Sequence, residues 1–283
     1  SSSPDWGLAR IHKRTLGELD SYEFDETAGS GIDVFVLDSG VNVGHTDFEG
    51  RARAAANFVD REDDIDLGGH GTHVAGKIAG KMYGVAKSAN IHSVKILNKS
   101  GDGTMSNLIK GISHVIQVAT PGKALINLSL SGPKSRLIDE AVSKLVNDYN
   151  IPVFVSAGNS GTDACYFSPS SNADAFAVGA TDVNDKVPYY SDTGRCVKVY
   201  APGSNIRSTW IGGSDETKVL DGTSMANPHV VGIAASLMSK QPSLSPKELY
   251  EAIVTKATSN MLTFTTTSDA DLNSNLIAYN GIH

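Results

Sequence analysis

Short apolar runs alternate with amphipathic segments along the first half of the chain. Four runs rich in Val, Ile, Leu and Phe, of the kind that forms buried parallel strands, cover residues 31–37, 90–97, 124–130 and 152–157. Between them, apolar residues recur at helical spacing, first at Leu108, Ile109, Ile112, Val115 and Ile116, then at Leu137, Ile138, Ala141, Val142, Leu145 and Val146. This alternation predicts an α/β fold with a mainly parallel twisted sheet and helices on both faces.

The C-terminal third continues the helical pattern. The near-wholly apolar run 226–238 predicts a buried helix, and Ser245-Pro246 places proline at the first position of another helix. Glycine is frequent, 28 of 283 residues, and falls between the apolar runs, where it favours tight turns over a linker. We therefore expect a single domain over residues 1–283.

Charge and composition exclude several classes of protein. The formal net charge of −7 opposes binding to nucleic acid, because that function needs a surface that neutralises phosphates. The longest apolar runs, such as 34–37, are far too short to span a bilayer. The chain starts at Ser1 without an initiator Met or a leader, which predicts a processed, mature form. The two cysteines, Cys165 and Cys196, are compatible with one bridge or with two buried thiols.

Three glycine-rich motifs each present a reactive side chain. They are Asp38-Ser39-Gly40 at the end of the first strong strand, the segment 69–76 that contains His70, and the segment 222–229 that contains Ser224. Ligands of open α/β sheets bind outside the carboxyl ends of the strands, where Asp38 is expected. Asp, His and Ser are the parts of a nucleophilic triad, in which a carboxylate orients the base that activates the serine.

Each of these residues also has an ordinary structural interpretation. Asp38 alone is compatible with a turn or helix-cap carboxylate, and Ser224 alone with a helix cap. His70 and His73, with the acidic loop 60–66 before them, could ligate a metal, although a solvated loop is the commoner role of such carboxylates. His73 and His229 adjoin apolar helical residues, which favours packed structural histidines. The combination of motifs in the order Asp, His, Ser favours a catalytic site.

With these motifs, the sequence resembles the subtilisin superfamily of serine endopeptidases, and in particular its proteinase K-like and cerevisin-like branch. The resemblance covers nearly the whole chain and includes Gly84-Val85-Ala86-Lys87, Ser208-Thr209-Trp210-Ile211-Gly212 and the fourth motif, Ser156-Ala157-Gly158-Asn159. It implies that Asp38 orients His70, that His70 is the general base and then the general acid, and that Ser224 attacks the carbonyl. Asn159 becomes the oxyanion donor, a role that suits an amide because it donates without titrating.

The resemblance also implies where a substrate binds. Segments that pair with an extended peptide correspond to Gly101, Asp102 and Gly103, to Ser129, Leu130, Ser131 and Gly132, and to Ala157 and Gly158 beside Asn159. Leu97, Met105 and Leu108 either line an apolar subsite or belong to the core. Ser131 stands where the family usually has glycine, so we expect a narrower primary specificity pocket.

Further properties are expected only from the resemblance. It implies polypeptide substrates, a monomer, a pro-segment that is removed, inhibition by that pro-segment or by protein inhibitors of subtilases, and a secreted or vacuolar location. It also implies a Cys165–Cys196 disulfide. Catalysis requires no cofactor in this family. We expect the usual structural Ca²⁺ site of proteinase K-like relatives to be absent here, because Lys198 occupies the place of its carboxylate. Lys198 either donates to the carbonyls of that site or points to solvent, while the loop 60–66 could hold an ion elsewhere. The alternatives to an endopeptidase are an esterase or amidase with the same triad and an inactive binding scaffold.

Overall fold

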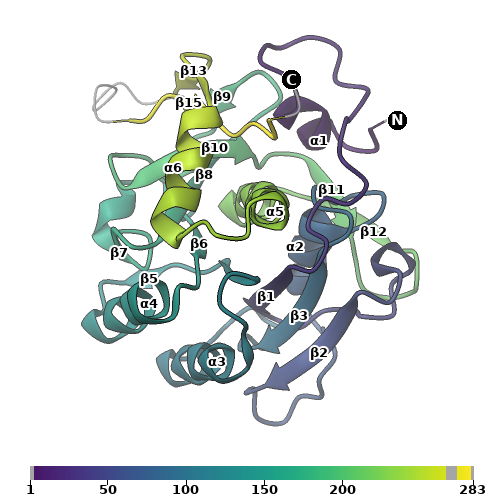
Figure 1. The fold of residues 1–283 in the computed structure, drawn as a ribbon, viewed down its shortest axis with the longest axis vertical. Helices are drawn as coiled ribbons and strands as arrows, with labels where there is room; N and C mark the ends of the chain where they lie inside the picture. Colours follow the sequence, from purple (N-terminus) through teal and green to yellow (C-terminus); the bar gives the residue numbers. More distant parts are fainter. Residues whose placement is uncertain (1–2, 266–272, 282–283) are drawn as a thin grey trace.

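A nine-stranded sheet forms the centre of the computed structural model, which describes residues 3–265 and 273–281 (Figure 1). The strand order is β13-β15-β10-β8-β6-β4-β1-β3-β2, and every pair is parallel except β13 with β15. The strands are β1 (Asp33–Asp38), β2 (Ala52–Asn57), β3 (Asn90–Lys95), β4 (Ala124–Leu128), β6 (Val153–Ser156), β8 (Phe176–Thr181), β10 (Val197–Pro202), β13 (Thr258–Ser259) and β15 (Leu276–Ile277). The predicted parallel sheet is confirmed.

Helices cover both faces of this sheet. Alternate side chains of β1 enter different cores: Val34 and Val36 pack with α2 (His70–Ala79), α5 (Thr223–Lys240) and α6 (Pro246–Lys256), whereas Phe35 and Leu37 pack with α3 (Met105–Val118) and α4 (Arg136–Tyr149). Because successive side chains of a strand point to opposite faces, the two cores lie on opposite sides of the sheet. The α/β prediction with helices on both faces is therefore confirmed.

Short elements complete the chain outside the large sheet. They are α1 (Trp6–Ile11), β5 (Gly132–Pro133), β7 (Phe167–Ser168), β9 (Lys186–Val187), β11 (Ile206–Thr209), β12 (Thr217–Leu220), β14 (Thr263–Phe264) and the 3₁₀ turns Thr46–Phe48 and Ala164–Tyr166.

The elements predicted from periodicity are all present. The four apolar runs form β1, β3, β4 and β6, and the helical stripes form α3, α4 and α5. Helix α6 begins as expected, since the Ser245 hydroxyl accepts from Glu248 N while the Glu248 side chain accepts from Ser245 N. Strands β2 and β8 were not predicted, because their sequences are short and mix small, polar and apolar residues.

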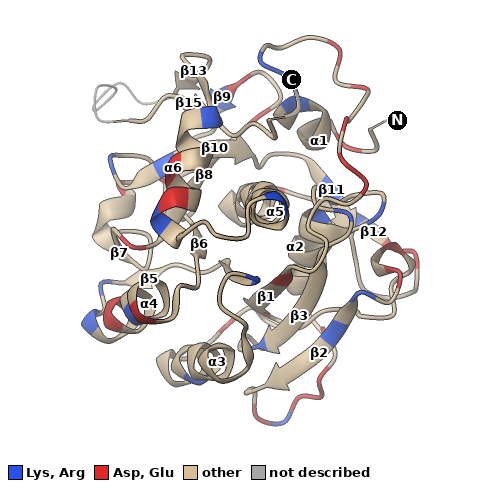
Figure 2. Cartoon of the chain, viewed as in Figure 1, with Lys and Arg blue, Asp and Glu red and all other residues tan. Residues whose placement is uncertain are grey.

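Charge is distributed without one dominant face. Figure 2 shows acidic and basic residues interspersed over the outer helices and loops, while α5 carries Lys240 as its one charged residue. Helix α5 is buried along most of its length and packs against α2 and against β4, β6, β8 and β10. None of the helices in the described part of the chain combines the length and the apolar composition of a membrane-spanning segment.

A disulfide joins Cys165 to Cys196, as the family resemblance implied, with a sequence separation of 31. It ties the turn before β7 to the residues that precede β10, next to the parallel bridge between Asp163 and Thr193.

Removing this bridge should weaken the fold without removing the sheet. For a loop of this length the chain-entropy model predicts a loss of about 3 to 4 kcal/mol in the free energy of unfolding for the double variant Cys165→Ser/Cys196→Ser. Urea denaturation of the two proteins measures the loss. Alkylation of both cysteines in folded protein without reductant would contradict the assignment.

Candidate active site

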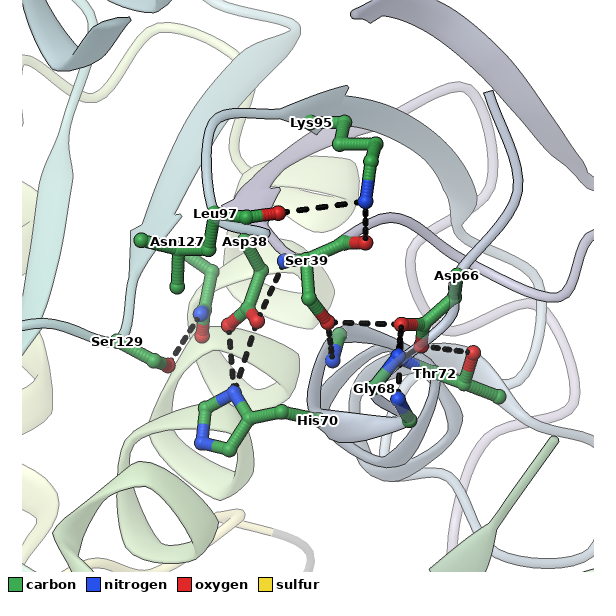
Figure 3. A network of polar contacts seen from close by, with 12 residues as sticks. Asp38, Ser39, Asp66, Gly68, His70, Thr72, Lys95, Leu97, Asn127 and Ser129 are labelled. Atoms are coloured by element: carbon green, nitrogen blue, oxygen red, sulfur yellow. Dashed lines mark hydrogen bonds and ion pairs between the residues drawn. The ribbon is translucent and has the colours of Figure 1, made fainter. Parts of the chain in front are cut away.

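The carboxylate of Asp38 and the imidazole of His70 form the centre of the site. Asp38 is the last residue of β1 and is fully buried, and His70 is the first residue of α2. The His70 Nδ1 lies 2.8 Å from Asp38 Oδ1 and 2.9 Å from Oδ2, while Oδ1 also accepts from Ser39 N at 2.7 Å. Since an ionised carboxylate only accepts, it fixes the imidazole proton on Nδ1. Figure 3 shows the other ring nitrogen, Nε2, turned away from Asp38, where it is left to accept a proton.

The loop before His70 is held by a second buried carboxylate. Asp66 accepts hydrogen bonds from the backbone N of Gly68 (3.1 Å), Gly69 (2.8 Å) and Thr72 (2.9 Å), and from the Thr72 hydroxyl at 2.6 Å. The Ser39 hydroxyl donates to Asp66 at 2.9 Å and accepts from Gly71 N at 2.9 Å (Figure 3). Asp66 thus ties the start of α2 to the end of β1.

The interpretation of the loop 60–66 as solvated holds for Asp60, Asp63 and Asp64, which are exposed, and is wrong for Asp66. Asp66 is only 6% exposed, because its oxygens satisfy backbone donors at the start of α2. Among the residues that the structure describes, no group of three or more His, Cys, Asp or Glu side chains is arranged to hold a metal ion.

Opposing influences set the pKa of His70. Burial lowers this pKa, but the charge of Asp38, its hydrogen bond to the ring and the charge of Asp66 together raise it above its ordinary value. Nε2 of His70 is therefore free to accept a proton only once the pH has risen through this elevated pKa.

A buried lysine fixes the backbone that follows Asp38. The Lys95 ammonium donates to Ser39 O at 2.7 Å and to Leu97 O at 3.3 Å, and it pairs with Glu62 Oε1 at 2.8 Å. The hydrogen bond from Lys95 is the main cause of the lowered pKa of Glu62. The sequence analysis missed Lys95, although a lysine inside the apolar run 90–97 was a signal for it.

Ser224 is the second residue of α5 and is 7% exposed. The first turn of α5 is anchored by Asn227, whose Nδ2 donates to Asn127 Oδ1 in β4 (3.3 Å) and to Phe154 O in β6 (3.2 Å). The start of α5 is thereby fixed to two neighbouring strands of the sheet.

Asn159 is oriented by the residue that precedes Ser224. Its Oδ1 accepts from Thr223 N at 2.8 Å and from the Thr223 hydroxyl at 2.9 Å, so its Nδ2 must face the other way. A Cβ added to Gly222 would lie 3.7 Å from Asn159 Nδ2 and 3.7 Å from Ser224 N. Two N–H donors therefore lie around one point beside Ser224. Within the described residues, Asn159 Nδ2, the Ser224 hydroxyl and His70 Nε2 take part in no hydrogen bond.

A cleft of about 370 Å³ brings the predicted peptide-binding segments next to His70. Its lining includes Leu97, Gly101, Ser129, Leu130 and Ser131. The turn that contains Asp102 and Gly103 is closed by the antiparallel bridge between Leu97 and Gly103. Gly132 begins β5, and Ala157 and Gly158 follow β6, with Ala157 fully buried. Leu108 packs in the core, whereas Met105 is exposed and does not line this cleft.

His73 and His229 are the packed structural histidines that the sequence predicted. Both are fully buried; His73 Nε2 lies 3.0 Å from Ile206 O and from Lys218 O, and His229 Nδ1 lies 2.8 Å from Met225 O. Burial, followed by the charge of Lys77, lowers the pKa of His73 to about 3 and that of His229 well below its ordinary value.

Lys198 lies on β10 beside a cavity that also borders Ala173 and Glu251. Its side chain is half-buried, and its ammonium donates no hydrogen bond to any carbonyl of the described residues.

The chain is similar to known proteases over nearly its whole length. The model of the Subtilase family (Peptidase_S8) matches residues 29–276. Subtilisin-like serine protease Pen c 2 of Penicillium citrinum is 42% identical, over 98% of this chain and 65% of its own length. Alkaline protease 2 of Aspergillus fumigatus is 41% identical, over 99% of this chain and 60% of its own. The chain thus spans less than two thirds of these relatives. A solved cold adapted subtilisin-like serine proteinase is similar over 99% of both chains, with 38% identity and a TM-score of 0.91.

The buried histidines predict acid sensitivity of the fold. Because the folded-state pKa values of His73 and His229 are depressed, the unfolded chain binds more protons below its own histidine pKa of about 6.5. Their contribution to stability is complete above that pH and is lost as the pH falls below it, by up to about 1.4 kcal/mol per pH unit for each histidine. Urea unfolding at pH 7.5, 6 and 5 should show this slope, and His73→Asn should reduce it. An identical slope in the two proteins would contradict the prediction.

Proposed function

The chain belongs to the subtilase family, and from this we propose that it is a serine endopeptidase that cleaves polypeptides through an acyl-enzyme on Ser224. The observation that carries the proposal is the hydrogen bond between the buried Asp38 carboxylate and Nδ1 of His70. This bond leaves Nε2 of His70 available at the edge of the sheet where α5 begins with Ser224. The chain covers only part of the length of its relatives. The activity of the whole protein is therefore also our inference, and it rests on the same contact between Asp38 and His70.

In the proposed acylation step, His70 acts as general base. Nε2 takes the proton from the Ser224 hydroxyl while Oγ forms a bond to the carbonyl carbon of the substrate. The resulting imidazolium keeps its Nδ1 proton on the Asp38 carboxylate, whose charge stabilises it. The imidazolium then gives the Nε2 proton to the leaving amine as the carbon–nitrogen bond breaks, which leaves the acyl ester on Ser224.

The negative charge that develops on the carbonyl oxygen needs donors already in position. Asn159 Nδ2 and Ser224 N meet this need, because Thr223 holds the other end of the Asn159 amide and because Ser224 N lies in the first turn of a helix. In the second step a water loses its proton to His70 and attacks the ester, and the proton returns to Ser224 as the acid product leaves.

The cleft favours peptides over small esters or amides. We propose that an extended polypeptide pairs with Gly101–Gly103 on one side and with Ser129–Gly132 on the other, while Ala157 and Gly158 flank the residue that is cleaved. Peptides of increasing length distinguish an endopeptidase from an esterase or amidase, because only an endopeptidase gains kcat/KM from remote contacts. An inactive scaffold has no use for unbonded donor and acceptor groups at Asn159, Ser224 and His70.

The remaining expectations stay proposals of the same kind. They are a monomeric, secreted or vacuolar enzyme, released from a pro-segment and inhibited by that segment or by protein inhibitors of subtilases. Catalysis by the residues above requires no metal ion. At the Lys198 position an ammonium replaces the carboxylate that calcium would need, so we propose that this site does not bind calcium.

Replacing the nucleophile should abolish turnover and leave the fold intact. In Ser224→Ala the hydroxyl that forms the ester is missing, so the rate on a peptide substrate should fall by a factor on the order of 10⁶. Peptide hydrolysis and the near-ultraviolet circular dichroism spectrum measure the two effects. Near-wild-type hydrolysis by the purified variant would rule out the proposal.

Asn159→Ala should retain the triad and lose one oxyanion donor. The expected decrease in kcat is about 100-fold to 1,000-fold with little change in KM, because the lost hydrogen bond forms mainly in the transition state. Steady-state kinetics on one peptide substrate separates the two parameters. A rise in KM at unchanged kcat would instead place Asn159 in substrate binding.

A further inference from the structure

Asp192 lies directly behind the segment that carries Asn159. Its side chain is buried, with 1% exposed, and its Oδ1 accepts from Ser160 N (2.9 Å), the Ser160 hydroxyl (2.7 Å) and Thr162 N (3.0 Å). The backbone N of Asp192 donates to Gly158 O at 2.9 Å. These bonds grip the chain on both sides of Asn159 and fix the direction of the carboxylate.

The second carboxylate oxygen has no partner. Oδ2 is buried and has no hydrogen-bond donor among the described residues, and no Lys or Arg of that part of the chain pairs with Asp192. A buried charge without a donor is costly, so it attracts any donor or cation that enters its surroundings. Oδ2 faces Gly158: a Cβ added to that glycine would overlap Oδ2 and would lie 3.3 Å from Ser131 Oγ.

This position adjoins the place of the substrate residue on the acyl side of the cleaved bond. Asn159 and Ser224 fix the reacting carbonyl, the Cα of the acyl residue is one bond from that carbonyl, and Gly158 is the neighbour of Asn159. Ser131 lies next to the same point, is exposed and lines the cleft, and its hydroxyl makes no hydrogen bond within the described residues. A side chain that enters between the ends of β4 and β6 meets the Ser131 hydroxyl, with the Asp192 charge behind it.

We propose that Ser131 and Asp192 form a negatively charged floor of this subsite, and that the floor selects substrates with Lys or Arg on the acyl side of the cleaved bond. The inference rests on the proposed function. The cation donates to Ser131 Oγ, whose own proton turns toward Asp192, and the buried charge attracts the cation at short range because little water screens it. Ser131 also narrows the pocket. The thin aliphatic stem of Lys or Arg enters a narrow pocket more easily than an aromatic ring does.

The isosteric variant Asp192→Asn tests this directly. Its Oδ1 retains the acceptor for Ser160 and Thr162, while an NH₂ group replaces the unpartnered oxygen. Peptides that differ only in the acyl-side residue (Lys, Arg, Leu or Glu) serve as substrates. We expect kcat/KM to fall about 10-fold to 100-fold for Lys and Arg, to stay within about twofold for Leu, and to rise for Glu. Competitive inhibition by benzamidine should weaken in parallel.

Asp163→Asn is the matched control, because it removes the same charge from the neighbouring turn, where Asp163 Oδ1 accepts from Cys165 N. It should leave the ratio of Lys to Leu cleavage unchanged. The same ratio in wild type and Asp192→Asn would overturn the inference, and so would an equal loss on every peptide, which would limit Asp192 to holding Asn159.

Labelling of Ser224 by a fluorophosphonate in these samples distinguishes failure of this inference from failure of the proposed function. Labelled protein with an unchanged ratio overturns only this inference, whereas failure of labelling overturns the proposed function and the inference with it.

Discussion

The site depends on one contact, the hydrogen bond between the buried Asp38 carboxylate and the His70 ring. A fully buried carboxylate is stable only if donors surround it, and here they come from Ser39 N and from the His70 ring. Both donors need a fixed backbone, which Lys95 provides by holding Ser39 O and which Asp66 provides by holding the start of α2. Around the site, the buried charges of Lys95 and Asp66 therefore fix the backbone that orients Asp38 and His70. Nε2 of His70 is left without a hydrogen bond.

The parallel sheet explains why residues so distant in sequence come together. Strands β1, β4 and β6 are neighbours and end at the same edge, so Asp38, Ser129 and Asn159 follow consecutive strands of the sheet. Helix α5 packs against β4 and β6 and is fixed to them by Asn227 and to Asn159 by Thr223. These bonds set the position of Ser224 without involving its hydroxyl, which is a requirement for a group that must form and break a covalent bond.

Most of the fold could be predicted from the sequence. Burial on both faces gives β1, β3, β4 and β6 continuous apolar runs, and α3 and α4 show apolar residues at helical spacing. The reactive motifs were visible because glycine turns flank them. Asp66 and Asp192 were not identified, because their burial depends on contacts from other elements, such as Ser39 for Asp66 and Ser160 for Asp192. Lys95 was missed although its place inside an apolar run indicated burial. In the acidic loop 60–66 the prediction of solvated carboxylates was therefore wrong for Asp66, which faces inward, and right for the exposed Asp60, Asp63 and Asp64.

The central claim is that the charge of Asp38 sets both the proton position and the basicity of His70, and thereby the reactivity of Ser224. The most direct test is the rate at which a fluorophosphonate labels Ser224 as a function of pH, in wild type and in Asp38→Asn. Because Asp38 raises the pKa of His70, the rate in wild type should fall as the pH drops through a midpoint above the ordinary histidine value. In Asp38→Asn the midpoint should move to lower pH and the plateau should drop steeply. An unchanged midpoint and plateau in the variant, or labelling independent of pH in wild type, would contradict the account.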